Sequence, residues 1–506
     1  MLVPIAATLL GGLTTASAET ILGVTIFSRH GDRTSKHYPS YTLTNLGAQQ
    51  NHRVGSDYRS LYLSSNSPKQ ILGISEDVYV PGQIFAQSPD QDVLSSSATA
   101  FLQGLYPPLT TLNESESEQS LSNGTTLSAP LNGYQYVQLR IESPDSPDSI
   151  WIKGDDSCNV VDNLLQGTQE AKINATRPFY QKFASVLENV TDIDRDYLSY
   201  EHAYDIYDLI NTARIHNASM EDAVSDADLF QLRTLADSRE FSVNFDPTYP
   251  EWSIGGRTLA GAVLNRMKET IATNGTSGKF SLMTGSYDTM LQFFSVYGVT
   301  ENNTNTDFTG LPEYASTIVF ELFTEKNTTS FPTDENDLKV RFLFHNGSTP
   351  DTELTAYPLF GADYYPAKEG VYNAPNPNPD STLTSPNNTL TSMPYIDFKF
   401  QLSQTALTTV ESWCRVCDSH KDFCVRFFAS CPLVYAERGM SNAVAGVIGA
   451  MVALAVVGGS GALAFFVVRR LLARRQAVTM EAAMAMGDVK GVEFDVRSVK
   501  SGRVRV

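Results

Sequence analysis

Basic residues are scarce in this sequence of 506 residues, which has 37 Lys or Arg against 56 Asp or Glu and a formal net charge of −19. A chain so acidic lacks the positive surface that nucleic acid requires, so nucleic acid is excluded as a partner. The deficit is uneven, because residues 469–506 hold nine Lys or Arg and four Asp or Glu. We therefore expect an acidic main body followed by a basic tail.

Cysteine is also scarce, with five residues in the whole chain. Cys414, Cys417, Cys424 and Cys431 lie close together, and Cys158 stands alone far upstream. A zinc cluster would need a second Cys-x-x-Cys pair, which the wider spacing of the last two cysteines does not provide, so we favour disulfides and predict no metal. Because five is odd, at least one thiol is free or intermolecular, and Cys158 is either that thiol or a long-range partner.

Two apolar segments predict how the chain is placed in the cell. The uncharged start of the chain predicts a signal peptide over 1–18, although it lacks an early Lys or Arg. The uncharged run from Ala443 to Val468 exceeds the roughly 20 residues that span a bilayer and predicts a transmembrane helix over 441–468. Arginines follow it directly, so 469–506 is expected to be a basic cytoplasmic tail and 19–440 a lumenal or extracellular domain. A glycolipid-anchor signal is the alternative, although a basic stretch should not follow such a signal.

N-glycosylation sequons agree with a single-pass type I membrane protein of the secretory pathway, whose ectodomain would be extracellular, vacuolar or otherwise lumenal. All ten precede the apolar segment, so N-glycans are expected on the ectodomain. Gly458, Gly459 and Gly461 in that segment would allow close helix pairing, which is a weak indication of a homodimer. The sequons begin at Asn113, Asn123, Asn174, Asn189, Asn217, Asn274, Asn302, Asn327, Asn346 and Asn387.

The pattern of apolar runs predicts an α/β fold with a mostly parallel sheet flanked by helices. Short apolar runs alternate with helical patterns, as in βαβ units. Residues from about 110 to 255 have mostly helical patterns and predict an inserted, mainly helical subdomain. The expected strands are 22–28, 84–88, 280–284, 317–323 and 339–344.

The run Arg29-His30-Gly31-Asp32-Arg33 follows the first expected strand directly. In α/β folds the carboxyl ends of strands border the active site. Phosphoryl transfer needs a nucleophile surrounded by cations, and one imidazole between two arginines supplies that set. A salt-bridged surface turn that happens to contain a histidine is the alternative.

These residues resemble the Arg-His-Gly-x-Arg-x-Pro signature of the histidine acid phosphatases, in branch 2 of the histidine phosphatase superfamily. The chain has Thr34-Ser35 where the family has x-Pro, and the stretches LTNLG (43–47) and SATAFLQGLYP (97–107) are similar to family motifs. The resemblance extends over roughly residues 20–435 and looks like that of divergent, membrane-anchored fungal members. It implies a phosphoglycerate-mutase-like fold, with His30 as the nucleophile, Arg29 and Arg33 as phosphate clamps, and no cofactor.

Two departures from the family pattern put activity in doubt. Gln87 takes the place of a third phosphate-binding arginine, and Tyr287 takes the place of the histidine that precedes the general acid, Asp288. Each substitution keeps a hydrogen-bonding group but loses a charge, so together they cost roughly 1–4 kcal/mol, or roughly 10- to 1000-fold in rate. Asp288 also fits an ordinary helix N-cap.

The sequence therefore predicts an acid phosphomonoesterase that acts on a small-molecule phosphomonoester through a phosphohistidine at His30. Arg29, Arg33, Gln87 and Tyr287 are the expected phosphate-binding residues. The alternative is an inactive family member that serves as a membrane-anchored binding or surface glycoprotein.

Overall fold

The structure, a computed structural model, describes residues 19–165, 169–188, 190–299, 308–349, 354–360 and 391–428. The chain divides into two units, Met1–Phe427 and Phe428–Val506. The predicted signal peptide, membrane helix and tail lie outside the described residues. Within the described part of the chain, no helix combines the length and the apolar character that crossing a bilayer requires.

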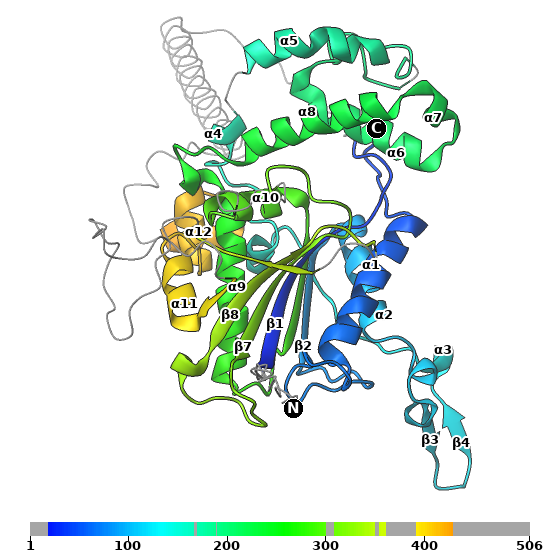
Figure 1. The fold of residues 1–506 in the computed structure, drawn as a ribbon, viewed down its shortest axis with the longest axis vertical. Helices are drawn as coiled ribbons and strands as arrows, with labels where there is room; N and C mark the ends of the chain where they lie inside the picture. Colours follow the sequence, from blue (N-terminus) through cyan, green and yellow to red (C-terminus); the bar gives the residue numbers. More distant parts are fainter. Residues whose placement is uncertain are drawn as a thin grey trace, which may run out of the picture. The chain divides into compact units, whose positions relative to one another are not determined.

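A mixed sheet occupies the centre of the first unit (Figure 1). Strands β1, β6, β2 and β5 run parallel to one another. β7 pairs antiparallel with β1, and β8 pairs antiparallel with β7. The order is β10-β8-β7-β1-β6-β2-β5, and β9 also pairs with β8. The strands are β1 (Thr20–Arg29), β2 (Ile84–Pro89), β5 (Arg140–Glu142), β6 (Phe280–Gly285), β7 (Thr317–Thr324), β8 (Lys339–His345), β9 (Thr355–Tyr357) and β10 (Ser392–Pro394).

All five strands expected from the sequence are present, and the α/β class is confirmed. The parallel arrangement holds for β1, β6, β2 and β5. It does not extend to β7 and β8. β7 pairs antiparallel with β1 even though helix α10 (Tyr287–Val296) precedes it, and the connection from β7 to β8 contains a short 3-10 turn and no α-helix. Parallel neighbours need a crossover, usually a helix, so a connection of this kind returns the chain antiparallel.

Helices cover both faces of the sheet (Figure 1). Ile26 of β1 belongs to the core that includes Val54 and Phe101 of the first two helices, whereas its neighbour Phe27 belongs to the core with Val263 and Phe293. Successive side chains of a strand point to opposite faces, so β1 stabilises both layers. The helices on the two faces are α1 (Asn45–Tyr58) and α2 (Asp92–Leu105), and α9 (Ile254–Ala272), α10 (Tyr287–Val296) and α11 (Tyr395–Ser403).

A helical subdomain is inserted between β5 and α9 and has an apolar core of its own. Its helices are α4 (Asp162–Leu165), α5 (Glu170–Tyr180), α6 (Ala203–His216), α7 (Ser219–Ala223) and α8 (Asp226–Asn244).

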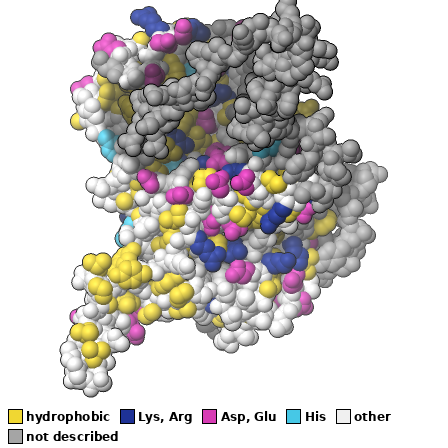
Figure 2. Space-filling model, turned by 180° about the vertical axis from the view of Figure 1, so that it is seen from behind, with side chains coloured by type: hydrophobic (Ala, Val, Ile, Leu, Met, Phe, Trp, Pro, Cys, Tyr) yellow, Lys and Arg dark blue, Asp and Glu magenta, His cyan; other side chains and the backbone are white. Residues whose placement is uncertain are grey.

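The first part of the range predicted to be helical, 110–161, is built differently. It contains a hairpin of β3 (Glu118–Ser120) and β4 (Thr126–Ser128), the short α3 (Pro130–Gly133), and strand β5. The Asn123-Gly124 pair, in which Gly124 has a φ of +81°, is the turn signal that the prediction overlooked. Apolar side chains gather on this extension (Figure 2).

Two disulfides confirm the predicted use of four cysteines. Cys158 is bonded to Cys417 and Cys414 to Cys424. The first bond ties the segment before the helical subdomain to α12 (Val410–Cys417), and the second ties α12 to α13 (Asp422–Phe428). Cys158 is therefore a long-range partner, and Cys431 lies outside the described residues.

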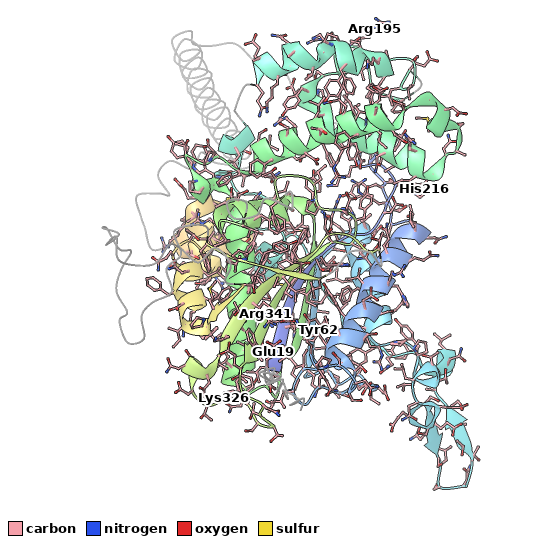
Figure 3. All side chains as sticks on the ribbon, in the orientation of Figure 1. Glu19, Tyr62, Arg195, His216, Lys326 and Arg341 are labelled. Atoms are coloured by element: carbon pink, nitrogen blue, oxygen red, sulfur yellow. A yellow bond between two sulfur atoms is a disulfide. The ribbon has the colours of Figure 1, made fainter. Side chains whose placement is uncertain are left out.

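A buried ion cluster stabilises the sheet away from the loop that follows β1. Glu321 is fully buried and pairs with Arg341 at 2.6 Å and with Lys69 at 2.8 Å. Tyr62 donates to the same carboxylate, and Arg341 also pairs with Glu19 (Figure 3). All charges in this cluster have partners, so we assign it a structural role.

Candidate active site

The sheet itself brings the predicted nucleophile and general acid together. β1 and β6 are parallel neighbours, and Arg29 pairs in register with Gly285. The loop that starts at His30 and helix α10, which starts at Tyr287, therefore leave the same edge of the sheet. Residues more than 250 positions apart in the sequence thus meet at the carboxyl ends of two adjacent strands, the usual place for a site in an α/β fold.

Gly31 allows this loop to pack closely on α1. A Cβ atom at Gly31 would lie 2.3 Å from the carbonyl oxygen of Gly47 and 2.6 Å from Asn51 Oδ1. Asn51 Nδ2 donates to the carbonyl of Arg29, which also fixes the loop against the helix. A side chain at position 31 would force the loop and helix apart.

His30 has the geometry of a nitrogen nucleophile. Its side chain is 2% exposed, and its Nδ1 lies 2.8 Å from the carbonyl oxygen of Gly31. Nδ1–H must donate to that oxygen, so the neutral ring carries its lone pair on Nε2. Nε2 is buried and has no hydrogen-bond partner among the described residues. Burial, followed by the charges of Arg29, Arg33 and Lys36, holds the pKa of His30 well below its usual value, which keeps the ring neutral.

His30 and Asp288 line one small cavity of about 80 Å³, here called the histidine cavity. Its size suits a single phosphoryl group. Its wall combines groups from the loop after β1, the start of α2, the loop before the helical subdomain, and the start of α10. The lining residues are His30, Lys36, Tyr41, Gln91, Val93, Leu94, Lys153, Ser286 and Asp288.

The start of α10 directs polar groups into the histidine cavity. Ser286 is the N-cap residue but makes no capping bond, and its Oγ is buried without a partner among the described residues. Asp288 is half-buried and accepts a hydrogen bond from the Thr289 amide at 3.0 Å. The alternative assignment of Asp288 as the N-cap is wrong, because Ser286 holds that position.

The two predicted arginine clamps contact groups outside the histidine cavity, and the Nε of each is buried without a partner among the described residues. Arg33 is fully buried, and its guanidinium contacts Asp208 of α6 at 2.9 and 3.1 Å and Tyr204 Oη at 2.9 Å. Arg29 donates to the carbonyl of Pro312, and its guanidinium carbon lies 4.6 Å from the ring centroid of Tyr314. Neither arginine lines the histidine cavity.

Gln87 and Tyr287 make hydrogen bonds to groups outside the histidine cavity. Gln87 Nε2 donates to the carbonyl of Asp148 at 3.1 Å. The Tyr287 hydroxyl donates to Glu240 of α8 at 2.8 Å, and burial together with this carboxylate raises the pKa of Tyr287 well above its usual value. Neither residue lines the histidine cavity, so their roles as phosphate ligands stay predictions.

Sequence reasoning missed the two lysines of the histidine cavity, Lys36 and Lys153. Lys36 is three residues after Arg33, a position that could have been noticed. Lys153 pairs with Asp156 at 3.0 Å and lies in the loop that the disulfide of Cys158 holds in place. No local pattern marks Lys153, because its position depends on that long-range bond.

Asp155, beside Lys153, was missed as well. Its Oδ1 is buried without a partner among the described residues. Burial and then the nearby charge of Asp288 raise the pKa of Asp155.

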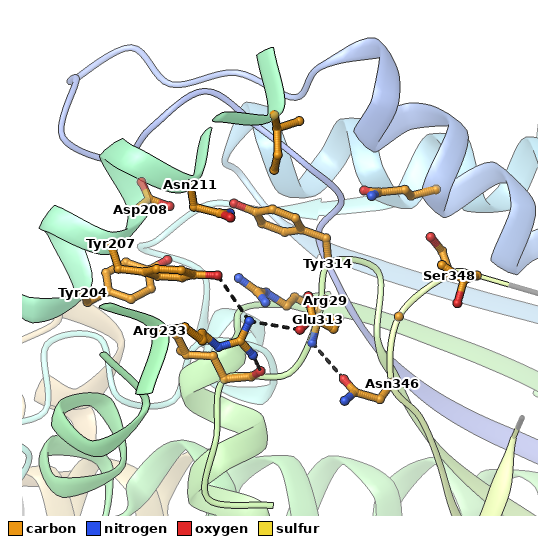
Figure 4. A pocket seen from close by; sticks show the side chains of 15 residues that line it. Arg29, Tyr204, Tyr207, Asp208, Asn211, Arg233, Glu313, Tyr314, Asn346 and Ser348 are labelled. Carbon is orange, nitrogen blue, oxygen red and sulfur yellow. Dashed lines mark hydrogen bonds and ion pairs between the residues drawn. The ribbon is translucent and has the colours of Figure 1, made fainter. Parts of the chain in front are cut away.

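A second, larger cavity of about 380 Å³ lies beside the site and is here called the tyrosine cavity (Figure 4). Arg29, Tyr204, Asp208 and Tyr314 line it, together with residues of α6, α8 and the loops around 311–314 and 346–349. Its Arg233 donates to Tyr207 Oη and pairs with Glu313 and Asp237. The wall thus combines three tyrosine rings with polar side chains, and of its charged groups Asp208, Arg233 and Glu313 have ion-pair partners.

Comparisons with known proteins show the family of the chain. Residues 37–345 match the model of the histidine phosphatase superfamily (branch 2). The matched span is more than half of the chain and begins just after Arg33. The lysosomal acid phosphatase of Xenopus laevis is 25% identical over 353 residues, which cover 66% of this chain and 72% of that protein.

Solved structures of phytases are similar at lower identity. The apo form of Hafnia alvei phytase is 12% identical with a TM-score of 0.46, over 78% of this chain and 99% of that one. The phytase from D. castellii is 13% identical with a TM-score of 0.45, over 82% and 85% of the two chains.

Proposed function

This chain belongs to branch 2 of the histidine phosphatase superfamily, and we propose that it is an acid phosphomonoesterase that acts through a phosphohistidine at His30. The observation that carries the proposal is the state of His30. Its Nε2 is buried, unpartnered among the described residues, and faces the cavity that Asp288 also lines. A neutral histidine held in one tautomer by Gly31 fits the role of nucleophile.

In the first step, Nε2 of His30 attacks the phosphorus atom of the ester. A phosphorus–nitrogen bond forms as the bond to the ester oxygen breaks, and Asp288 gives its proton to the departing alkoxide. In the second step, water gives a proton to the Asp288 carboxylate and attacks phosphorus, and the phosphorus–nitrogen bond breaks to release inorganic phosphate. Each residue returns to its starting state.

The mechanism requires a neutral His30 and a protonated Asp288, and together these conditions favour acid pH. The low pKa of His30 keeps the nucleophile available below pH 6.5, where an ordinary histidine would be charged. Asp155 is a second acidic group near the site, and burial together with the charge of Asp288 raises its pKa. We expect activity to rise as the pH falls from neutral.

The second candidate is an inactive binding protein of the same fold. One observation favours it: Arg33, the expected clamp, is already neutralised by Asp208. A site whose arginines serve structure would bind a phosphorylated ligand without turnover. For location we propose a membrane-anchored ectodomain with N-glycans in the secretory pathway, supported by the predicted apolar segments, by the sequons and by the name of the Xenopus relative.

Hydrolysis of p-nitrophenyl phosphate by the full chain, from about pH 3 to 8, tests the proposal. His30→Ala, prepared identically, shows whether host phosphatases contribute, and His420→Ala at an exposed position is the matched histidine control. We expect His30→Ala to lose all activity and His420→Ala to keep it. Equal rates for all three proteins would refute the phosphohistidine mechanism for this substrate.

A further inference from the structure

The cations that line the histidine cavity are lysines and not the two arginines that flank His30. A phosphoryl dianion in a buried site must be neutralised by cations or by hydrogen-bond donors. Arg33 is paired with Asp208, and Arg29 lines the tyrosine cavity instead. The cations that line the histidine cavity are the lysines at positions 36 and 153.

Lys36 is held in place by its main chain, and its charge is left unpaired. Its backbone amide donates to Asp208 Oδ2 at 2.9 Å, which fixes the start of the side chain. Its Nζ lies 5.1 Å from the ring centroid of Tyr287 and 5.7 Å from that of Tyr204. Across the described residues, no ion pair involves Lys36, whereas Lys153 is paired with Asp156.

We infer that the Lys36 ammonium is the principal cation that contacts the phosphoryl group in the histidine cavity, with Lys153 as the second. This inference rests on the proposed function, because it assigns a further substrate-contacting residue to the same site. The Lys36 ammonium lies over the ring of Tyr287, and the family has a histidine at the position of Tyr287. The positive charge of that histidine is absent here, and Lys36 supplies a positive charge close to the same position.

Two further observations point to an anion in this cavity. Ser286 is 8% exposed, and its unpartnered Oγ belongs to the cavity wall. It caps α10, a helix of ten residues whose first amide groups carry partial positive charge. Nε2 of His30, also in the cavity wall, is likewise buried without a partner among the described residues. A phosphoryl group placed between them would accept from the serine hydroxyl, the helix and the ammonium.

The charge of Lys36 is sensitive to pH in an accessible range. Burial and then the charge of Arg33 lower the pKa of Lys36 to about 8. A bound phosphate that depends on this ammonium is therefore released as the pH rises through that value. The charged and titratable groups that face Lys36 are His30, Arg29 and Arg33 of its own loop, Tyr204 and Asp208 of α6, Glu240 of α8, and Tyr287 and Asp288 of α10.

Binding of inorganic phosphate to the full chain, measured by calorimetry from about pH 5 to 9.5, tests this inference separately from turnover. The variants are Lys36→Gln, Lys36→Arg, and Lys182→Gln as the matched control. Lys182 is 59% exposed, pairs with Asp228 and lines neither cavity. We expect Lys36→Gln to weaken phosphate binding about 10- to 100-fold, because a hydrogen bond to a charged group is lost. Lys182→Gln should bind as the wild type does.

The pH dependence of phosphate binding by Lys36→Arg distinguishes a lysine that contacts phosphate from one that only supports the fold. A guanidinium stays charged at every pH of the titration, so the alkaline loss of affinity near pH 8 should disappear while affinity at pH 6 stays within about fivefold. Binding that depends on Lys36 without hydrolysis would sustain the inference and defeat the proposed enzyme. Hydrolysis by the wild type, with phosphate binding and KM unchanged in Lys36→Gln, would support the proposed enzyme and overturn the inference about Lys36. Absence of phosphate binding by the wild type would also overturn the inference.

Discussion

Asp208 of α6 is the residue through which the helical subdomain holds the loop after β1. It is 3% exposed, and its carboxylate contacts the fully buried guanidinium of Arg33 at 2.9 and 3.1 Å. The same carboxylate accepts from Ser35 Oγ at 2.8 Å and from the Lys36 amide at 2.9 Å. Four donors from one short loop thus converge on one side chain.

The substitution Asp208→Asn removes the negative charge and keeps the shape. The guanidinium of Arg33 then stays buried without a counter-ion, which costs about 3–5 kcal/mol. A loss of that size is a large part of the roughly 5–15 kcal/mol that stabilises a folded domain. We expect the urea midpoint of the full chain to fall accordingly, with little change in the slope of the transition.

Asp226→Asn is the matched control, because Asp226 also pairs with an arginine, Arg214, at 2.9 Å, but is 95% exposed. Exposed pairs contribute at most about 1 kcal/mol. The double variant Asp208→Asn with Arg33→Met removes the orphaned charge and should recover much of the lost stability. If Asp208→Asn costs no more than Asp226→Asn, or if the double variant is less stable than the single one, the buried-charge argument is refuted.

Three further predictions concern pH, the disulfide and the family substitutions. Burial lowers the pKa of His37, but its hydrogen bonds to Asp205 and to the Thr191 carbonyl, with the nearby carboxylate charges, together raise it. These contacts therefore stabilise the fold below about pH 6.5 and are lost as the pH rises through the folded-state value. The stability deficit of His37→Gln, from urea unfolding, should therefore be larger at pH 5.5 than at pH 8.5, and equal deficits would contradict this. Replacing both Cys158 and Cys417 with serine should lower the unfolding free energy by roughly 4 kcal/mol, because their bond closes a loop with a sequence separation of 259. The double variant should also have a lower kcat, because the loop that carries Lys153 is held less firmly. An unchanged urea midpoint would contradict this prediction. Gln87→Arg should change kcat/KM for an aryl phosphate by less than about threefold, since the side chain at 87 points to a backbone carbonyl, and a gain above about tenfold would show that it reaches the phosphate.

The sequence was sufficient to predict the elements that carry local signals. Apolar runs gave the five main strands, and the position of His30 directly after β1 gave the site its place. Asp288 was placed correctly because a strand, a loop and a helix follow one another around it, and parallel pairing of β1 with β6 then brings it to His30. These inferences depend on short-range pattern and on a general rule about sheet edges.

Side-chain direction was beyond the reach of the sequence. The flanking arginines looked like clamps for phosphate, yet Arg33 turns to Asp208, which lies 175 residues away in an inserted subdomain. Nothing in the local pattern around Asp208 indicates that contact. The antiparallel pairing of β7 with β1 was missed for a similar reason, because strand orientation depends on the connections rather than on the strands.

The loop after β1 is best understood as part of an interface with α6. His216 of α6, labelled in Figure 3, lies 2.7 Å from the buried Asp32, and His37 lies 3.0 Å from Asp205, so two histidine–carboxylate contacts accompany the one made by Asp208. A loop held by three contacts from a separate subdomain cannot place its side chains independently of that subdomain. The motif at 29–33 therefore identifies the charged residues of the loop. The contacts with α6 decide which of those charges remain without a partner. On this reasoning Arg33 holds the loop to α6, and we expect the cation that contacts phosphate to be Lys36, whose amide donates to Asp208 and whose Nζ lies near the ring of Tyr204.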